Sequence, residues 1–300
     1  MVYIKLLLTA AFWGGTFVAG RGLATHMGPF CAAFWRFALA SILLWFMVKR
    51  MEGGLPKLEP RQLPIVIALG LTGVFAYNFF FFYGLKTVAA GRAAVIVALN
   101  PIGISLLSAL FFRERIGLAK AAGITLSVCG GVYVISRGSP LQIFQGAAGV
   151  GDLAIMGAVV SWILYSIIGK RAMSGLTPAS AVTYSSIVGA AALVVPALIE
   201  GGPKAFFSYP AAAWGEIAYL GFFGTVLGFT WYYSGIKAIG PSRASVFINI
   251  VPVFAILSGF FILGEEIHHS LLIGAAMVGS GVWLTNRVGI CPAAGVREKR

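Results

Sequence analysis

The chain has 300 residues, of which 59% are apolar and 10% are charged, and its formal net charge is +13. Soluble domains carry about a quarter charged residues, so this composition excludes an ordinary soluble domain and indicates a chain that faces lipid. In a soluble protein such a positive charge would suggest nucleic acid, but here the basic residues lie mostly between hydrophobic runs. They predict contact with anionic membrane lipid and a defined topology, and no nucleic-acid partner.

Hydrophobic segments follow one another along nearly the whole chain. A helix needs about 20 apolar residues to cross the hydrocarbon core. Ten segments qualify: 3–23, 29–49, 63–83, 91–112, 117–136, 151–170, 179–199, 213–234, 242–263 and 270–286. The sequence therefore predicts an all-α integral membrane protein with ten transmembrane helices, multi-pass in the cell inner (cytoplasmic) membrane.

The basic residues predict the orientation of these helices. If the helices alternate in direction, few of the 22 lysine and arginine residues lie on the side opposite the N-terminus. Those few are Arg21, Lys86, Arg92, Arg137 and Lys204. Arg36 lies inside the second segment, and the others lie on the N-terminal side. Because cytoplasmic connections carry the excess of lysine and arginine, both termini are expected in the cytoplasm.

The second half of the sequence repeats the first. Trp13 and Pro29 recur as Trp162 and Pro178, 149 residues later. Further on the offset is 151: Gly84, Lys86, Arg92, Ala93, Val95, Pro101, Glu114 and Gly123 recur as Gly235, Lys237, Arg243, Ala244, Val246, Pro252, Glu265 and Gly274. Because each repeat has five helices, an odd number, the second copy starts on the opposite side of the membrane and is inverted. Secondary transporters with inverted repeats bind substrate near the midplane between the halves. The expected division is 1–137 for the first repeat, 138–287 for the second, and 288–300 for a basic tail.

Several motifs occur in a fixed order: the run Ala11-Phe12-Trp13-Gly14-Gly15-Thr16-Phe17, then Pro29 with Trp35-Arg36-Phe37, then Gly84-Leu85 leading to Pro101 and Glu114. Together with their second-half counterparts they resemble the EamA family of the drug/metabolite transporter superfamily, over roughly residues 5–287. The resemblance implies a ten-helix basket that exports small metabolites, often amino acids. The second half departs from the pattern at Trp162, which no Gly-Gly pair follows.

Polar and aromatic residues inside the predicted helices are the candidates for substrate binding, because polar groups in hydrocarbon usually face a cavity or another helix. Arg36 could bind a substrate carboxylate, or it could pair with helix-end carbonyls and hold helices together. Asparagine amides suit a zwitterion but also join helices. Pro101 and Pro252 free the carbonyls of Val97 and Ile248. The candidates are Trp13, Arg36, Tyr77, Asn78, Asn100, Trp162, Tyr165, Tyr184, Trp231 and Asn249.

The sequence lacks the motifs that other functional classes require. A phosphate-binding loop is missing, since Arg171 follows Gly169-Lys170, and no His/Cys cluster or pair of acidic residues suggests a metal or an active site. The sequence therefore predicts no enzyme and no cofactor or metal. The leading hypothesis is a secondary transporter that exports small-molecule metabolites, with amino acids as the expected substrates, by alternating access. A carrier of anionic metabolites such as sugar phosphates and a passive channel for small solutes are the alternatives; the oligomeric state is not indicated.

The orientation can be tested with single cysteines in a chain whose native cysteines are replaced by serine. An impermeant thiol reagent applied from outside should label Gly202→Cys and should not label Gly295→Cys or a cysteine at position 1. External labelling of either terminus would contradict the predicted orientation.

Overall fold

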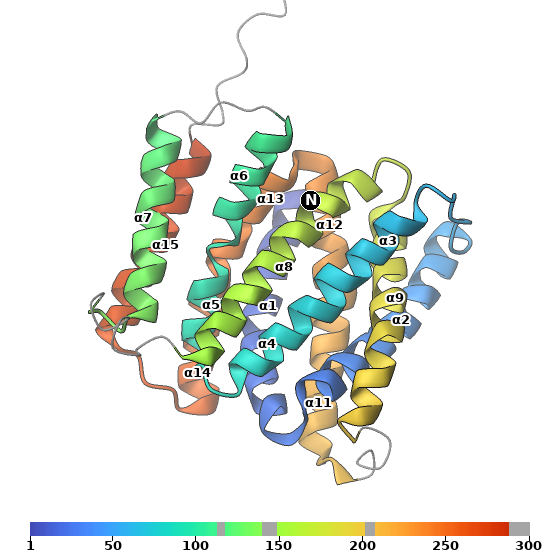
Figure 1. Ribbon diagram of the computed structural model, residues 1–300, viewed down its shortest axis with the longest axis horizontal. Coiled ribbons are helices and arrows are strands. Elements are labelled where there is room, and N and C mark those ends of the chain that lie inside the picture. Colours follow the sequence, from blue (N-terminus) through green and yellow to red (C-terminus); the bar gives the residue numbers. More distant parts are fainter. Residues whose placement is uncertain (113–117, 140–148, 202–207, 288–300) are drawn as a thin grey trace, which may run out of the picture.

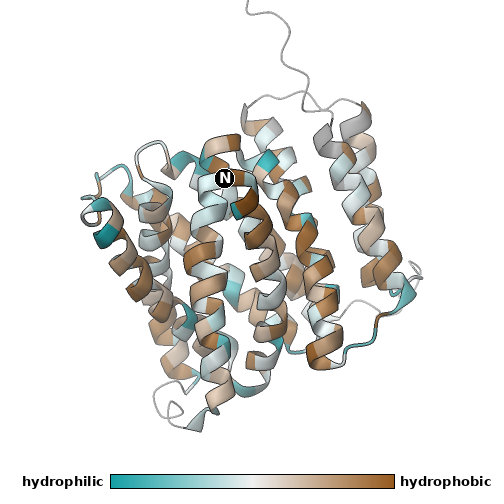
Figure 2. Cartoon of the chain, turned by 180° about the vertical axis from the view of Figure 1, so that it is seen from behind, coloured by the Kyte–Doolittle hydropathy of each residue, from teal (hydrophilic) through white to brown (hydrophobic). Residues whose placement is uncertain are grey.

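The computed structural model describes residues 1–112, 118–139, 149–201 and 208–287. Within these ranges nearly all residues are helical and no strand occurs. Eight helices are long and apolar enough to cross a membrane, and two shorter apolar helices, Ala121–Ile135 and His269–Gly281, accompany them. Hydrophobic residues cover the helices, and hydrophilic ones lie mostly at helix ends and in connections (Figure 2). The all-α membrane fold with ten helices that the sequence predicts is confirmed.

Each half contains the same series of elements. The first half comprises α1 (Val2–His26), α2 (Pro29–Glu52), α3 (Leu63–Leu69), η1 (Gly70–Ala76), α4 (Tyr77–Leu85), α5 (Ala90–Val97), α6 (Asn100–Phe112) and α7 (Leu118–Ile135). The second comprises α8 (Val150–Ala172), α9 (Pro178–Ile199), α11 (Ala211–Tyr219), η4 (Leu220–Leu227), α12 (Gly228–Ile239), α13 (Pro241–Ser245), η5 (Val246–Ile250), α14 (Val251–Leu263) and α15 (His269–Arg287). Several of these elements join end to end, so that α3, η1 and α4 form one rod, as do α11, η4 and α12.

The helices of the two halves pack in matching pairs. Helix α1 packs against α12 and α14, and its repeat counterpart α8 packs against α4 and α6. Helices α2 and α9, which are counterparts, pack against each other, and so do α7 and α15. A twofold relation between the halves produces this exchange of partners. Figure 1 shows α7 and α15 side by side at one edge of the bundle.

Small residues form the contact between α7 and α15. A Cβ atom added to Gly130 would lie 2.7 Å from the Cβ of Met277 and 2.9 Å from the carbonyl oxygen of Gly274. The hydroxyl of Ser127 donates to the carbonyl of Val278 at 3.1 Å. Small side chains let two helix backbones approach closely, which drives association in lipid, where the hydrophobic effect is missing.

Two repeat-related rods depart from α-helical geometry at the same place. The π-helical segments η1 and η4 follow α3 and α11, so each half has a widened turn at the middle of its third helix. Near the prolines, α5 ends at Val97 before α6 begins at Asn100, and the second half has the 3-10 segment η5 at the corresponding place. Wide turns of this kind occur frequently at functional sites.

Carboxylates at helix ends cap the neighbouring helices. Glu52, at the end of α2, accepts hydrogen bonds at 2.8 Å from the hydroxyls of Thr177 and Ser180, where α9 begins. Glu200, just after α9, accepts one at 2.8 Å from the backbone N–H of Cys31, where α2 begins. The two antiparallel counterparts therefore cap each other, and each negative charge lies at a positive helix N-terminus.

The contact between α7 and α15 yields a stability prediction. Gly130→Ala should lower the apparent melting temperature in detergent, because overpacking costs about 1 to 3 kcal/mol and outweighs the gain in helix propensity of about 0.5 to 1 kcal/mol. The matched control is Gly279→Ala on α15, where an added Cβ meets nothing within 4 Å. This control should leave the melting temperature unchanged or raise it, and equal effects of the two changes would refute the packing argument.

Candidate functional site

A small cavity, called the central cavity below, lies between the two halves. Its volume is about 20 Å³, which is room for about one water molecule. It is lined by Trp13, Thr16, Phe17, Arg36, Tyr77, Val97, Asn100, Trp162, Phe229, Ile248 and Val251. Both halves contribute, and of the described residues in the lining Arg36 is the only charged one.

Repeat-related residues face each other across the central cavity. Trp13 and Trp162 both line it, and their rings are 5.1 Å apart and nearly perpendicular. Val97 and its counterpart Ile248, four residues before the prolines, line it as well. Asn100 faces the cavity together with its own counterpart, Val251. Since three counterpart pairs share one cavity, the twofold axis runs through it, as expected of a midplane transport site.

Arg36 is 2% exposed and lies on the first-half side of the central cavity. Its Nη1 donates to Oδ1 of Asn78 at 2.9 Å, and its Nε donates to Oγ1 of Thr225 at 3.0 Å. The guanidinium also lies over the rings of Phe37 and Phe229, at 5.1 and 5.8 Å from their centres. Among the described residues no carboxylate forms an ion pair with Arg36. A buried cation held only by neutral partners is costly, and it can still attract an anionic group.

Asn100 presents a second polar group to the central cavity. It is fully buried, and neither its Oδ1 nor its Nδ2 has a hydrogen-bond partner within the described part of the chain. Buried polar atoms in proteins are nearly always bonded. An amide with both ends unsatisfied at a cavity wall is therefore suited to a ligand that offers a donor and an acceptor.

Aromatic rings form most of the remaining wall. The ring of Trp162 lies 5.1 Å from Tyr77, 4.9 Å from Phe229 and 5.3 Å from Tyr165, measured between ring centres. The indole N–H of Trp13 donates to the carbonyl of Gly224 at 2.9 Å, which attaches α1 to the π-helical segment η4. The cavity thus combines one cation and one amide with several π faces.

The predicted site residues fall into three groups. Those in the lining are Trp13, Arg36, Tyr77, Asn100 and Trp162. Asn78 and Tyr165 are fully buried directly behind it, the first bonded to Arg36 and the second packed on Trp162. Tyr184, Trp231 and Asn249 are not among the lining residues.

These three residues have other surroundings. The hydroxyl of Tyr184 donates to the carbonyl of Pro56. The ring of Trp231 lies 6.0 Å from Phe12. Asn249 lies in η5, where its Oδ1 is buried and has no partner among the described residues.

Phe229 and Thr225 contact predicted site residues but were not themselves predicted. Phe229 packs on both central tryptophans, 4.9 Å from Trp162 and 6.1 Å from Trp13. Thr225 bonds to Arg36. The only sequence signal near Thr225 was the close spacing of Gly224 and Gly228, which predicts tight packing but identifies no partner.

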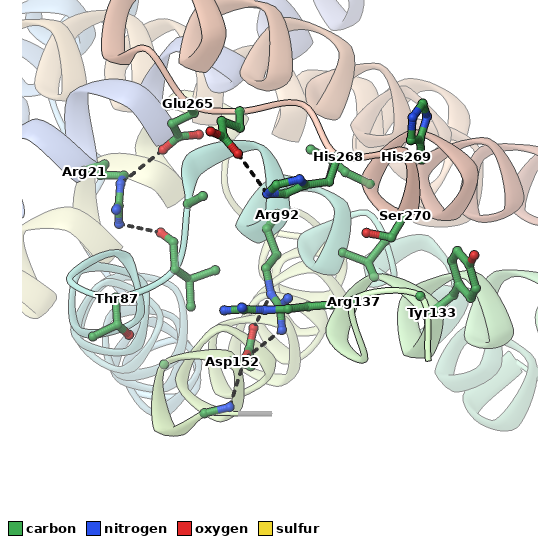
Figure 3. Close-up of a pocket in the computed structure, with 18 of the residues that line it drawn as sticks. Arg21, Thr87, Arg92, Tyr133, Arg137, Asp152, Glu265, His268, His269 and Ser270 are labelled. Carbon is green, nitrogen blue, oxygen red and sulfur yellow. Dashed lines mark hydrogen bonds and ion pairs between the residues drawn. The ribbon is translucent and has the colours of Figure 1, made fainter. Parts of the chain in front are cut away.

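A larger pocket of about 1070 Å³ lies at one end of the bundle, bordered by residues of α5, α7, α8 and α15 (Figure 3). Arg21 pairs with Glu265 at 3.1 Å, and Arg92 forms two bonds with Asp152 at 2.8 and 3.0 Å. Glu265 also accepts the backbone N–H of Ala90 at 2.9 Å. These two ion pairs and the contact with Ala90 join helix ends, whereas the smaller central cavity is lined by predicted site residues of both halves.

Comparisons with known proteins agree with this architecture. The model of the EamA-like transporter family matches residues 1–137 and 149–287. The uncharacterized transporter YyaM of Bacillus subtilis is 33% identical over 299 residues, covering 99% of this chain and 97% of that protein. The probable terminal-alkyne amino-acid exporter of Streptantibioticus cattleyicolor is 28% identical over 286 residues, covering 94% of this chain and 92% of that protein.

One solved crystal structure shares the fold, with a TM-score of 0.68 at 20% identity, covering 97% of this chain and 99% of that chain. The helical architecture, the family model and the 33% identity to YyaM over nearly the whole length lead to the same assignment. This chain is a multi-pass membrane protein and belongs to the EamA-like transporter family.

Proposed function

We propose that this transporter exports neutral amino acids by alternating access. The observation that supports this most is Arg36, a buried cation at the wall of the central cavity without a carboxylate partner in the described chain. A substrate carboxylate would supply the missing anion, and arginine binds carboxylates through two parallel hydrogen bonds. A cationic drug would meet only the like charge of Arg36.

The rest of the cavity suits the other parts of an amino acid. An ammonium group can donate to Oδ1 of Asn100 and lie against aromatic faces. Aliphatic or aromatic side chains can pack against the tryptophan pair and the apolar residues Val97 and Ile248. The relative from Streptantibioticus cattleyicolor, named a probable terminal-alkyne amino-acid exporter, supports the same substrate class.

The small volume of the central cavity favours a carrier over a passive channel. With room for about one water molecule, the cavity has no space for a solute until its walls separate. The irregular segments η1, η4 and η5 and the break between α5 and α6 lie next to this wall. They are the places where the rods can bend, as alternating access requires.

The alternative of an anionic metabolite such as a sugar phosphate has less support. The basic residues considered for it are Lys86, Arg92, Lys237 and Arg243. Arg92 is bonded to Asp152, and the other three are exposed near helix ends. None of these four residues is among those that line the central cavity. In the proposed arrangement both termini lie in the cytoplasm, the transporter lies in the inner membrane, and repeats 1–137 and 138–287 surround the site.

The proposal is tested with the purified chain in liposomes. Radiolabelled leucine, lysine, glutamate and glucose 6-phosphate are loaded inside, and efflux is followed with and without unlabelled solute outside. Saturable efflux of leucine, with little transport of lysine or glucose 6-phosphate, is the expected result. Saturable transport of the sugar phosphate alone, or flux that rises linearly with concentration, would replace the proposal with one of the alternatives.

Asn100→Leu separates binding from folding. Because the amide makes no bond in the described structure, an apolar residue of similar size should leave the melting temperature unchanged or raise it. Its counterpart Val251 is already apolar. The half-saturating leucine concentration should rise about tenfold, the effect of one lost hydrogen bond to a charged group. Asn78→Leu is the contrasting variant: it breaks bonds that are made and should lower the melting temperature. Unchanged transport by Asn100→Leu would remove Asn100 from the site.

A further inference from the structure

We infer that Asn78 and Thr225 are positioning residues for Arg36, and that the substrate carboxylate displaces Thr225 from it. This displacement makes the transporter favour exchange of substrates over net export. The inference rests on the proposed function, since it requires a substrate with a carboxylate.

Two side chains accept hydrogen bonds from Arg36 in the described structure, Thr225 from Nε and Asn78 from Nη1. Asn78 and Thr225 are both fully buried, and each uses its remaining donors on a carbonyl of a π-helical turn. The hydroxyl of Thr225 donates to the carbonyl of Leu220 at 3.1 Å, five residues earlier, inside η4. The amide of Asn78 donates to the carbonyl of Val74 at 2.8 Å, inside η1. Through these two partners Arg36 connects the widened turns of both halves.

The two bonds of Arg36 differ in what they join. Asn78 belongs to the same half as Arg36, so that bond fixes the side chain within the first half. Thr225 belongs to the second half, so its bond joins α2 to η4. Any movement that separates these two segments must break the Arg36–Thr225 bond and leave a buried cation with an unused donor, which is costly.

The partner that a carboxylate replaces depends on the guanidinium edge that it binds, and the inference assigns it to the edge made by Nε and Nη2. Its two oxygens bind one edge of the guanidinium, formed by two N–H groups side by side. On the edge made by Nε and Nη2, Nε donates to Thr225, and Gly224 lies alongside, where an added Cβ would be 3.4 Å from Nη2. Asn78 holds Nη1 outside this edge. A carboxylate that takes the Nε/Nη2 edge therefore displaces the Thr225 hydroxyl and leaves the Asn78 bond intact.

The preference for substrate exchange over net export follows from the replacement of Thr225 by the substrate carboxylate. The empty transporter loses the cross-half bond when it changes conformation, whereas the loaded transporter has already replaced it by the stronger charge-assisted bonds of the substrate. A ligand shifts a conformational equilibrium only by its differential interaction with the two states. The Arg36–Thr225 bond provides that difference, because it is present in only one of them.

The test compares Thr225→Val with wild type in liposomes, measuring leucine efflux against buffer and against external leucine. In Thr225→Val the transporter without substrate should change conformation faster, because the bond between the halves is missing. The ratio of exchange to net efflux should therefore fall about tenfold, as expected for one hydrogen bond to a charged group. The half-saturating concentration should not rise, because the displaced partner is already gone. Thr225→Ser should restore the wild-type ratio.

The matched control is Thr183→Val on α9, a fully buried threonine whose hydroxyl donates at 2.7 Å to Ala179 of its own helix. It should leave the ratio unchanged. Thr225→Ala is the second variant if Thr225→Val does not fold. A wild-type ratio in Thr225→Val, or an equal loss of both fluxes, overturns the inference while the proposed function stands. Absence of saturable leucine flux in the wild type overturns both.

Discussion

A single buried cation sets the requirements that the centre of this membrane protein must meet. Arg36 lies in α2, buried within the protein, and forms no ion pair with a carboxylate of the described chain. The surroundings compensate with an amide, a hydroxyl and two aromatic faces. The amide of Asn78 and the hydroxyl of Thr225 are in turn held by carbonyls of the widened turns η1 and η4. The ring of Phe229 is held by its packing on Trp162.

The twofold relation builds this centre from two similar halves, and its function depends on where they differ. The tryptophan pair and the pair Val97 and Ile248 are alike in chemistry, so they form similar walls from both sides. Asn100 faces an apolar counterpart, Val251, and no second arginine lines the cavity opposite Arg36. The framework is therefore close to symmetric, while the polar groups of the lining are not. Among the described acidic residues, Glu52 and Glu200 act at helix ends as caps.

The fold could be predicted almost completely from the sequence. The lengths of the hydrophobic segments indicate the membrane helices, and the constant offset between the repeats indicates the two halves. The offset identified Trp13 and Trp162 as equivalent residues, and their contact is consistent with a twofold relation between the halves. The π-helical turns could not be predicted, since residues 70–76 and 220–227 read as ordinary hydrophobic helix and their widening depends on tertiary contacts. For the same reason Thr225 was missed, and Tyr184 was included although its hydroxyl bonds to Pro56 away from the cavity. A polar residue in a helix is visible in the sequence, but the direction in which it points depends on the neighbours.

The position of Arg36 in the lining of the central cavity has an electrical consequence for the proposed substrate. A membrane potential of 100 mV does about 2.3 kcal/mol of work on each elementary charge that crosses it. A zwitterion carries no net charge, and the positive charge of Arg36 stays with the protein. For the proposed substrate, a neutral amino acid, a crossing without a coupled ion moves no net charge and does no work against the membrane potential. An anion taken up by the same arginine would instead be pushed outward by a potential that is negative inside.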